Sequence, residues 1–221
     1  MAKGYTQTKG VDFLYTFSPV AKMATIRLLL SLASIYNWEL KQLDINNAFL
    51  HGDLKEDLYM VAPPGLTSIP PEKVCKLKKA LYGLKQASGE WFVKLLSFFL
   101  YMGYTQSMND HSLFINSSEG SFTTLLIYVD DIILAGNDKE EIARIKQALN
   151  QTFKIKDLGN LRYFLGLEIS SHDARPIGTS GYVKDYKLQA LIPYVPPVER
   201  GEPFSSFKRM MVNKLDFNSA T

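Results

Sequence analysis

The chain has 221 residues, of which 46% are hydrophobic, and its 25 basic and 22 acidic residues leave a net charge of +3. That length and composition suit one large domain or two small ones with an ordinary core, and the charge does not by itself indicate a nucleic-acid partner. The single cysteine, Cys75, excludes an internal disulfide framework, and three histidines (His51, His111 and His172) lack zinc-ligand spacing. No apolar run is long enough for a membrane span, and no signal-peptide pattern follows Met1. We therefore expect an intracellular protein, cytoplasmic or nuclear, in a reducing compartment and without a membrane partner.

The first half of the chain alternates helical and strand patterns. Apolar residues recur at helical spacing after Pro19, which fits the first turn of a helix. Two proline-rich stretches indicate loops. The predicted elements are a helix over Lys22–Tyr36, a strand over Trp38–Ile45, a turn with a short helix over Asn46–Gly52, a strand over Asp57–Val61, and loops at Pro63–Gly65 and Pro70-Pro71.

The second half mixes hairpins with two helices. Asp138 and Glu141 resemble a capping box at a helix start, and Gly103 ends the preceding helix. Because the strands form hairpins and not regular βαβ units, we predict an α+β sheet with helices on one face. The predicted elements are a helix from Ala87 to about Met102, a hairpin of Ser112–Asn116 with Ser121–Tyr128, a strand over Ile132–Ala135, a helix through Ile142, Ile145 and Leu149 to about Thr152, and strands over Phe153–Lys156 and Leu161–Ile169 separated by Leu158-Gly159-Asn160.

Periodicity weakens after Ser171. We predict one domain over residues 1–171 and a divergent tail over residues 172–221, either docked as a short segment or disordered.

The stretch Tyr128-Val129-Asp130-Asp131 places two adjacent carboxylates between strongly β-forming runs, and Asp44 lies near the end of another. Carboxylates that converge at strand ends suit a two-metal phosphoryl-transfer site, because hard divalent cations prefer oxygen ligands. The alternative is a solvated Asp-Asp pair near a turn, which is common.

A second candidate surface is Lys73–Lys85, which carries five lysines, one tyrosine and no acid. A basic segment with an aromatic residue could follow a phosphate backbone. A solvated charged face explains the same pattern equally well.

Four motifs follow one another along the chain: Gln42–Leu50 (QLDINNAFL), Ala80–Ala87 (ALYGLKQA), Tyr128–Asp131 (YVDD) and Leu161–Ile169 (LRYFLGLEI). In this order they resemble the reverse transcriptase of copia-type LTR retrotransposons. Flanking stretches agree, among them Ala2–Gln7, Thr16–Lys22, Leu50–Tyr59 and Lys156–Leu161, so that the similarity extends over about Met1–Ser171.

The resemblance implies a right-hand polymerase fold with a palm and part of the fingers, and with the thumb absent or unrecognisable. By the family motifs, Asp44 and Asp130 would ligate two Mg²⁺ ions, with Mn²⁺ as an alternative, and Asp131 would complete the catalytic cluster. The implied partners are an RNA template, a DNA primer, deoxynucleoside triphosphates and the rest of a Pol polyprotein.

The resemblance also implies binding residues. Phe49 would lie under the incoming sugar and favour deoxynucleotides, although a plain core aromatic is an equal alternative. A basic residue past the catalytic hairpin would be Lys154 or Lys156, and Leu165-Gly166-Leu167 resembles the hairpin that grips the primer. The implied nucleotide-binding residues are Phe49, Tyr82, Gly83 and Lys85, and the implied primer and template residues are Tyr128, Leu165, Gly166, Lys76, Lys78 and Lys79.

Three features depart from the family. The chain begins at what resembles the middle of the fingers, Ser88-Gly89-Glu90 stands where Pro-Arg-Ala is usual, and the residues after Ser171 do not resemble a thumb. The leading hypothesis is a truncated RNA-directed DNA polymerase domain. The alternatives are an inactive relic that at most binds nucleic acid, and a small Asp-Asp metal phosphatase or nuclease.

Overall fold

The structure is a computed structural model that describes residues 2–63, 65, 70 and 73–169, so the expected tail and part of both proline loops lie outside it. The described chain alternates helices and strands in nearly the predicted order. The helices are η1 (Gly4–Thr6), α1 (Met23–Tyr36), η2 (Ala48–His51), α2 (Ala87–Tyr101) and α3 (Lys139–Phe153). The strands are β1 (Glu39–Ile45), β2 (Tyr59–Val61), β3 (Val74–Lys76), β4 (Thr105–Gln106), β5 (Leu113–Ser118), β6 (Ser121–Tyr128), β7 (Asp131–Gly136), β8 (Ile155–Asn160), β9 (Tyr163–Phe164) and β10 (Leu167–Glu168).

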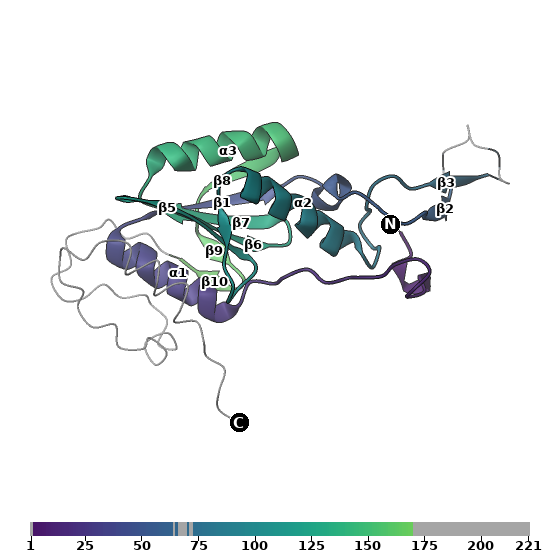
Figure 1. Ribbon diagram of the computed structural model, residues 1–221, viewed down its shortest axis with the longest axis horizontal. Coiled ribbons are helices and arrows are strands. Elements are labelled where there is room, and N and C mark those ends of the chain that lie inside the picture. Colours follow the sequence, from purple (N-terminus) through teal and green to yellow (C-terminus); the bar gives the residue numbers. More distant parts are fainter. Residues whose placement is uncertain (1, 64, 66–69, 71–72, 170–221) are drawn as a thin grey trace, which may run out of the picture.

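A six-stranded antiparallel sheet in the order β4-β5-β6-β7-β1-β8 organises the molecule, which confirms the mixed α+β prediction. Strand β1 lies between β7 and β8, although both follow it by about ninety residues or more. Strands β2–β3 and β9–β10 form two separate antiparallel pairs that are not hydrogen-bonded into this sheet. The β2–β3 pair projects from one end of the molecule (Figure 1). The central position of β1 brings Asp44 beside the acidic hairpin.

Helices cover both faces of the sheet, so the prediction of helices on one face is wrong. Helices α2 and α3 pack on one face, and α1 lies on the opposite one (Figure 1). Strands β6 and β7 explain this, because Ile132 and Leu134 bury toward α2 and α3 while Ile133 and Ala135 bury toward α1. A strand that is apolar on both sides needs cover on both sides. We call these the α2–α3 face and the α1 face.

The helix ends follow local chemistry closely. Asn37, in the left-handed region at φ 53°, ends α1, and Gly103 with φ 88° follows the end of α2 as predicted. The Asp138 side chain caps α3 by accepting from the Glu141 backbone N–H at 2.9 Å. Only this half of the predicted capping box forms, because the Glu141 carboxylate instead accepts from Tyr104 and Arg144.

Two predictions near the end of the domain are wrong. Leu158-Gly159-Asn160 does not separate two strands but belongs to β8, which pairs with β1 through a register shift, and Phe153 is the buried last residue of α3. The strand over Leu161–Ile169 is instead a hairpin, as the resemblance implies for Leu165-Gly166-Leu167, because Leu165 and Gly166 turn the chain with φ values of 47° and 80°. Positive φ at two successive positions cannot continue a strand.

Candidate active site

Asp44 and Asp131 are cross-strand partners in the β1–β7 ladder. Directly opposed residues in an antiparallel pair share a face, with Cβ atoms about 4.5–5.5 Å apart. Both side chains lie on the α1 face. Leu40 precedes Asp44 by four residues in β1 and Ile133 follows Asp131 by two in β7, so each shares a face with its aspartate, and both belong to the core on the α1 face. The register therefore brings together two carboxylates that are 87 positions apart in the sequence.

The third carboxylate, Asp130, lies in the two-residue turn that joins β6 to β7. Tyr128 and Asp131 close this turn as a cross-strand pair, and Val129 adopts a left-handed φ of 59°. That conformation costs a β-branched residue roughly 1–2 kcal/mol. The Asp130 carbonyl accepts from the Ile45 backbone N–H at 2.9 Å, which fastens the turn to the residue after Asp44.

The carboxyl of Asp131 lies within the electrostatic influence of both other candidate carboxylates. Burial raises the pKa of the Asp131 carboxyl, a hydrogen bond from Gln42 lowers it, and the charges of Asp130 and Asp44 raise it further. The net effect is a pKa above the ordinary value. Gln42 was not predicted from the sequence to belong to this site. Its position two residues before Asp44 in a strand nevertheless places the side chains of Gln42 and Asp44 on one face.

The donor chemistry of this cluster fits divalent cations. The charges of Asp130 and Asp44 disfavour ionisation of Asp131, and a cation would favour the ionised carboxylate oxygens as ligands. Among the residues that the structure describes, no three His, Cys, Asp or Glu side chains are gathered closely enough to hold an ion together. The β1–β7 register thus provides a facing pair of carboxylates, and the adjoining turn carries the third, Asp130.

The implied nucleotide-binding residues lie in η2 and in the loop that precedes α2. The rings of Phe49 in η2 and Tyr82 stack with centroids 5.6 Å apart, and Tyr82 is 65% exposed. Gly83 has φ 101°. A Cβ added to Gly4 would lie only 1.9 Å from the Gly83 carbonyl oxygen, so the two backbones pack closely. The backbone N–H of Lys85 donates to the Gln7 side chain at 2.8 Å. The N-terminal segment therefore holds the Tyr82–Lys85 loop in place.

Three of the implied primer and template residues, Tyr128, Leu165 and Gly166, lie together beside the α1 face. Tyr128 packs edge-on against Phe164 of β9, with ring centroids 6.2 Å apart. Leu165 and Gly166 form the adjoining β9–β10 turn, and Leu165 is 39% exposed. The hairpin is thus fastened beside the turn that carries Asp130.

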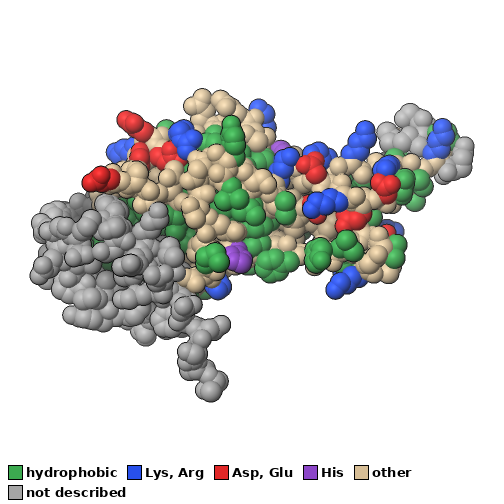
Figure 2. Space-filling view, in the orientation of Figure 1, with side chains coloured by type: hydrophobic (Ala, Val, Ile, Leu, Met, Phe, Trp, Pro, Cys, Tyr) green, Lys and Arg blue, Asp and Glu red, His purple; other side chains and the backbone are tan. Residues whose placement is uncertain are grey.

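Two lysines of the basic segment Lys73–Lys85 are already paired with carboxylates. Lys76 pairs with Asp57 at 2.6 Å, and the Lys79 ammonium pairs with Asp53. Figure 2 shows basic and acidic side chains interleaved toward the β2–β3 end of the molecule. Lys78 is exposed and makes no ion pair within the described part of the chain. Of the three predicted lysines, Lys78 is the one that no carboxylate pairs with among the residues that the structure describes.

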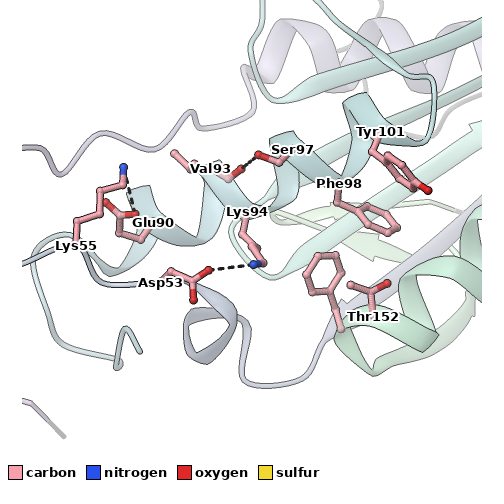
Figure 3. Close-up of a pocket in the computed structure, with 10 residues that line it drawn as sticks. Asp53, Lys55, Glu90, Val93, Lys94, Ser97, Phe98, Tyr101 and Thr152 are labelled. Carbon is pink, nitrogen blue, oxygen red and sulfur yellow. Dashed lines mark hydrogen bonds and ion pairs between the residues drawn. The ribbon is translucent and has the colours of Figure 1, made fainter. Parts of the chain in front are cut away.

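A hollow of about 430 Å³ lies elsewhere, between α2 and the end of α3 (Figure 3). Phe98 and Phe153 line its apolar part, and the Lys94–Asp53 ion pair crosses its rim at 3.0 Å. Glu90, one of the residues that depart from the family pattern, also lines it and pairs with Lys55 at 3.8 Å. None of the three candidate catalytic carboxylates borders this hollow.

Comparison with known proteins identifies the family. A model described as "Reverse transcriptase (RNA-dependent DNA polymerase)" matches residues 1–184, so the chain belongs to the reverse transcriptase family. Its relatives include copia-type Pol polyproteins. It is 47% identical over 169 residues to the "Retrovirus-related Pol polyprotein from transposon RE1" of Arabidopsis thaliana, which covers 76% of this chain. It is 45% identical over 171 residues to that from transposon TNT 1-94 of Nicotiana tabacum, again covering 76% of the chain.

A yeast relative, the "Transposon Ty1-GR3 Gag-Pol polyprotein" of Saccharomyces cerevisiae, is 36% identical over 147 residues, or 63% of this chain. The matched regions span only 12%, 13% and 8% of the lengths of the three relatives. No solved structure matches the chain. Within the described residues, none of the helices combines the length and the apolar character that a bilayer crossing requires.

Proposed function

We propose that the chain is the nucleotidyl-transfer region of an RNA-directed DNA polymerase, with the six-stranded sheet as its palm and the N-terminal segment with β2–β3 as part of its fingers. The opposition of Asp44 and Asp131 across β1 and β7 is the observation that carries this proposal. Family membership supports it, because the motifs that hold these carboxylates lie within the matched residues.

In this proposal the primer 3′ oxygen bonds to the α-phosphorus of a deoxynucleoside triphosphate, and pyrophosphate leaves. Asp44, Asp130 and Asp131 would hold two Mg²⁺ ions, or Mn²⁺ in their place. When bound, such ions lower the pKa of the attacking hydroxyl and neutralise phosphate charge. Gln42 orients Asp131 through its hydrogen bond, and the β-ladder keeps the carboxylates from separating.

The remaining residues position the substrates. Phe49 and Tyr82 would bound the space for the sugar and base, and Lys85 would meet a phosphate. Tyr128 and the Leu165–Gly166 turn would lie along the primer, and Lys78 would contact the backbone of the RNA template–DNA primer duplex. Holding the reacting groups in line supplies much of the catalysis in phosphoryl transfer.

Primer extension on an RNA template tests the proposal directly. The chain is compared with its Asp130→Asn, Asp131→Asn double variant and with Asp138→Asn, a matched carboxylate-to-amide control that keeps the α3 cap. We expect template-dependent extension in the chain and in Asp138→Asn, and none in the double variant. A folded chain that binds the template–primer but never extends it would instead identify an inactive relative.

A further inference from the structure

Both backbone carbonyls of the acidic turn accept hydrogen bonds from outside the β6–β7 hairpin. The indole Nε1–H of Trp91 in α2 donates to the Val129 carbonyl at 2.8 Å. The Ile45 backbone N–H donates to the next carbonyl, that of Asp130, at 2.9 Å. Because Val129 has a φ of 59°, which β-branched residues disfavour, the turn depends on contacts beyond its own two strands.

Trp91 is held rigidly enough to serve as a fixed donor. Its side chain is 1% exposed, and its ring meets Phe153 edge-on at 5.2 Å and His51 at 5.6 Å. Behind it, Gly52 lies so close that a Cβ there would come within 3.0 Å of the Trp91 backbone nitrogen. The indole is therefore enclosed on several sides, and its N–H direction is set by the packing of α2 against η2 and α3.

We infer that Trp91 is a positioning residue for the candidate active site, an inference that rests on the proposed function. By holding the Val129 carbonyl, it keeps Val129 left-handed. This backbone conformation determines where Asp130 and Asp131 point as they follow the turn. A tryptophan that merely fills the core would also bury its ring, but its N–H would not need to meet this carbonyl.

Trp91→Phe tests the inference, because it keeps an aromatic ring and removes only the donor and the second ring. The full chain and the variant are titrated with Mn²⁺, and free Mn²⁺ is measured by electron paramagnetic resonance. We expect the variant to bind Mn²⁺ about tenfold more weakly, the lower end of the effect of lost outer-shell partners. Adding Val129→Gly to this variant should restore much of the affinity, because glycine adopts positive φ without strain.

Trp38→Phe is the matched control. Trp38 is buried on the α1 face, where it stacks on Phe122 at 4.7 Å. This variant should lose stability but keep its Mn²⁺ affinity. Where Mn²⁺ binding depends on Asp130 and Asp131, a folded Trp91→Phe variant with unchanged affinity, or one that Val129→Gly does not rescue, would overturn the inference.

The Asp130→Asn, Asp131→Asn variant separates this inference from the proposed function. If the double substitution leaves Mn²⁺ binding unchanged, the proposed metal site fails. The positioning inference is then decided by the backbone NMR shifts of Val129 and Asp130, which need no metal. We expect these shifts to change in Trp91→Phe and to stay in place in Trp38→Phe, and unchanged shifts in Trp91→Phe would refute the positioning role.

Discussion

Lys156 of β8 lies directly opposite Asp44 of β1, on the side away from Asp131. The other basic residue considered from sequence, Lys154, instead ends α3 with φ 59°, and its carbonyl accepts from the Asn46 side chain at 2.8 Å. The β1–β8 register thus brings the charge of Lys156, and not that of Lys154, into line with the carboxylate pair.

This register predicts how Lys156 influences cation binding. Opposed charges across a ladder contribute roughly 0.2–1 kcal/mol, so Lys156→Ala should strengthen Mn²⁺ binding by about 1.4- to fivefold at low ionic strength. Lys154→Ala is the control and should change the affinity less. The measurement is a Mn²⁺ titration of both variants, and equal effects of the two substitutions would contradict the assignment.

Phe49 is predicted to discriminate between sugars. Phe49→Ala should raise ribonucleotide incorporation relative to deoxynucleotide incorporation by at least tenfold, about 1.4 kcal/mol, because the ring no longer opposes a 2′-hydroxyl. Single-nucleotide extension assays with paired triphosphates measure this ratio. Tyr82→Phe, which keeps the stacked ring, is the control. If Phe49→Ala lowers stability but leaves the ratio unchanged, Phe49 is a plain core aromatic.

The lysines of the basic segment should differ in their contribution to nucleic-acid binding. Lys78→Ala should reduce the slope of log K against log salt by about 0.7–0.9, the value of one lost phosphate contact. Lys79→Ala should change the slope less, because Asp53 already pairs with its ammonium. Fluorescence anisotropy of a labelled template–primer over a range of salt concentrations compares the two variants. Equal slopes for both would show that the ion pair opens on binding.

Asp110 fastens α1 to the sheet. Its carboxylate is 2% exposed and accepts from the Lys22 backbone N–H at 3.0 Å, from the Thr25 hydroxyl at 2.6 Å and from the Ser112 backbone N–H at 3.0 Å. Asp110→Ala leaves these buried donors unsatisfied and should lower the free energy of unfolding by roughly 3 kcal/mol. Glu119→Ala, at an exposed turn, should change it by less than about 0.5 kcal/mol. Urea denaturation of both variants measures the difference.

Tyr104 should make stability fall at alkaline pH. Burial raises the pKa of its hydroxyl well above the ordinary value of 10.0, and the hydrogen bond to Glu141 raises it further. Because the unfolded state loses this proton near pH 10 while the folded state keeps it, the stabilisation is complete below pH 10 and declines above it.

The stability advantage of the native chain over Tyr104→Phe should therefore shrink between pH 10 and pH 12. Tyr101→Phe is the control, because Tyr101 is 88% exposed. Denaturant unfolding at a series of pH values measures both differences. An advantage that stays constant across this range would contradict the role of burial.

The sequence by itself determined the family and the kinds of chemistry available. Ordered motifs around Asp44, Tyr82 and Asp131 carry the resemblance, and helical periodicity predicted α1, α2 and α3 to within a few residues. These features are local, because side-chain spacing and caps act over a few positions. The pattern of residues alone indicates one strand over Leu161–Ile169, because non-glycine residues rarely adopt positive φ and Leu165 gives no local signal of it. The hairpin at Leu165-Gly166-Leu167 is indicated only by the family resemblance, and the structure contains it.

Only the tertiary structure decided which residues meet. The placement of β1 between β7 and β8 made Asp131 and Lys156 the two neighbours of Asp44, and the packing of α2 brought the Trp91 N–H to the Val129 carbonyl. The tertiary structure also pairs Lys79 with Asp53 and covers both faces of the sheet with helices. Each of these contacts joins positions distant in sequence. Strand register and helix docking are set by the whole core and leave no periodic signature along the chain.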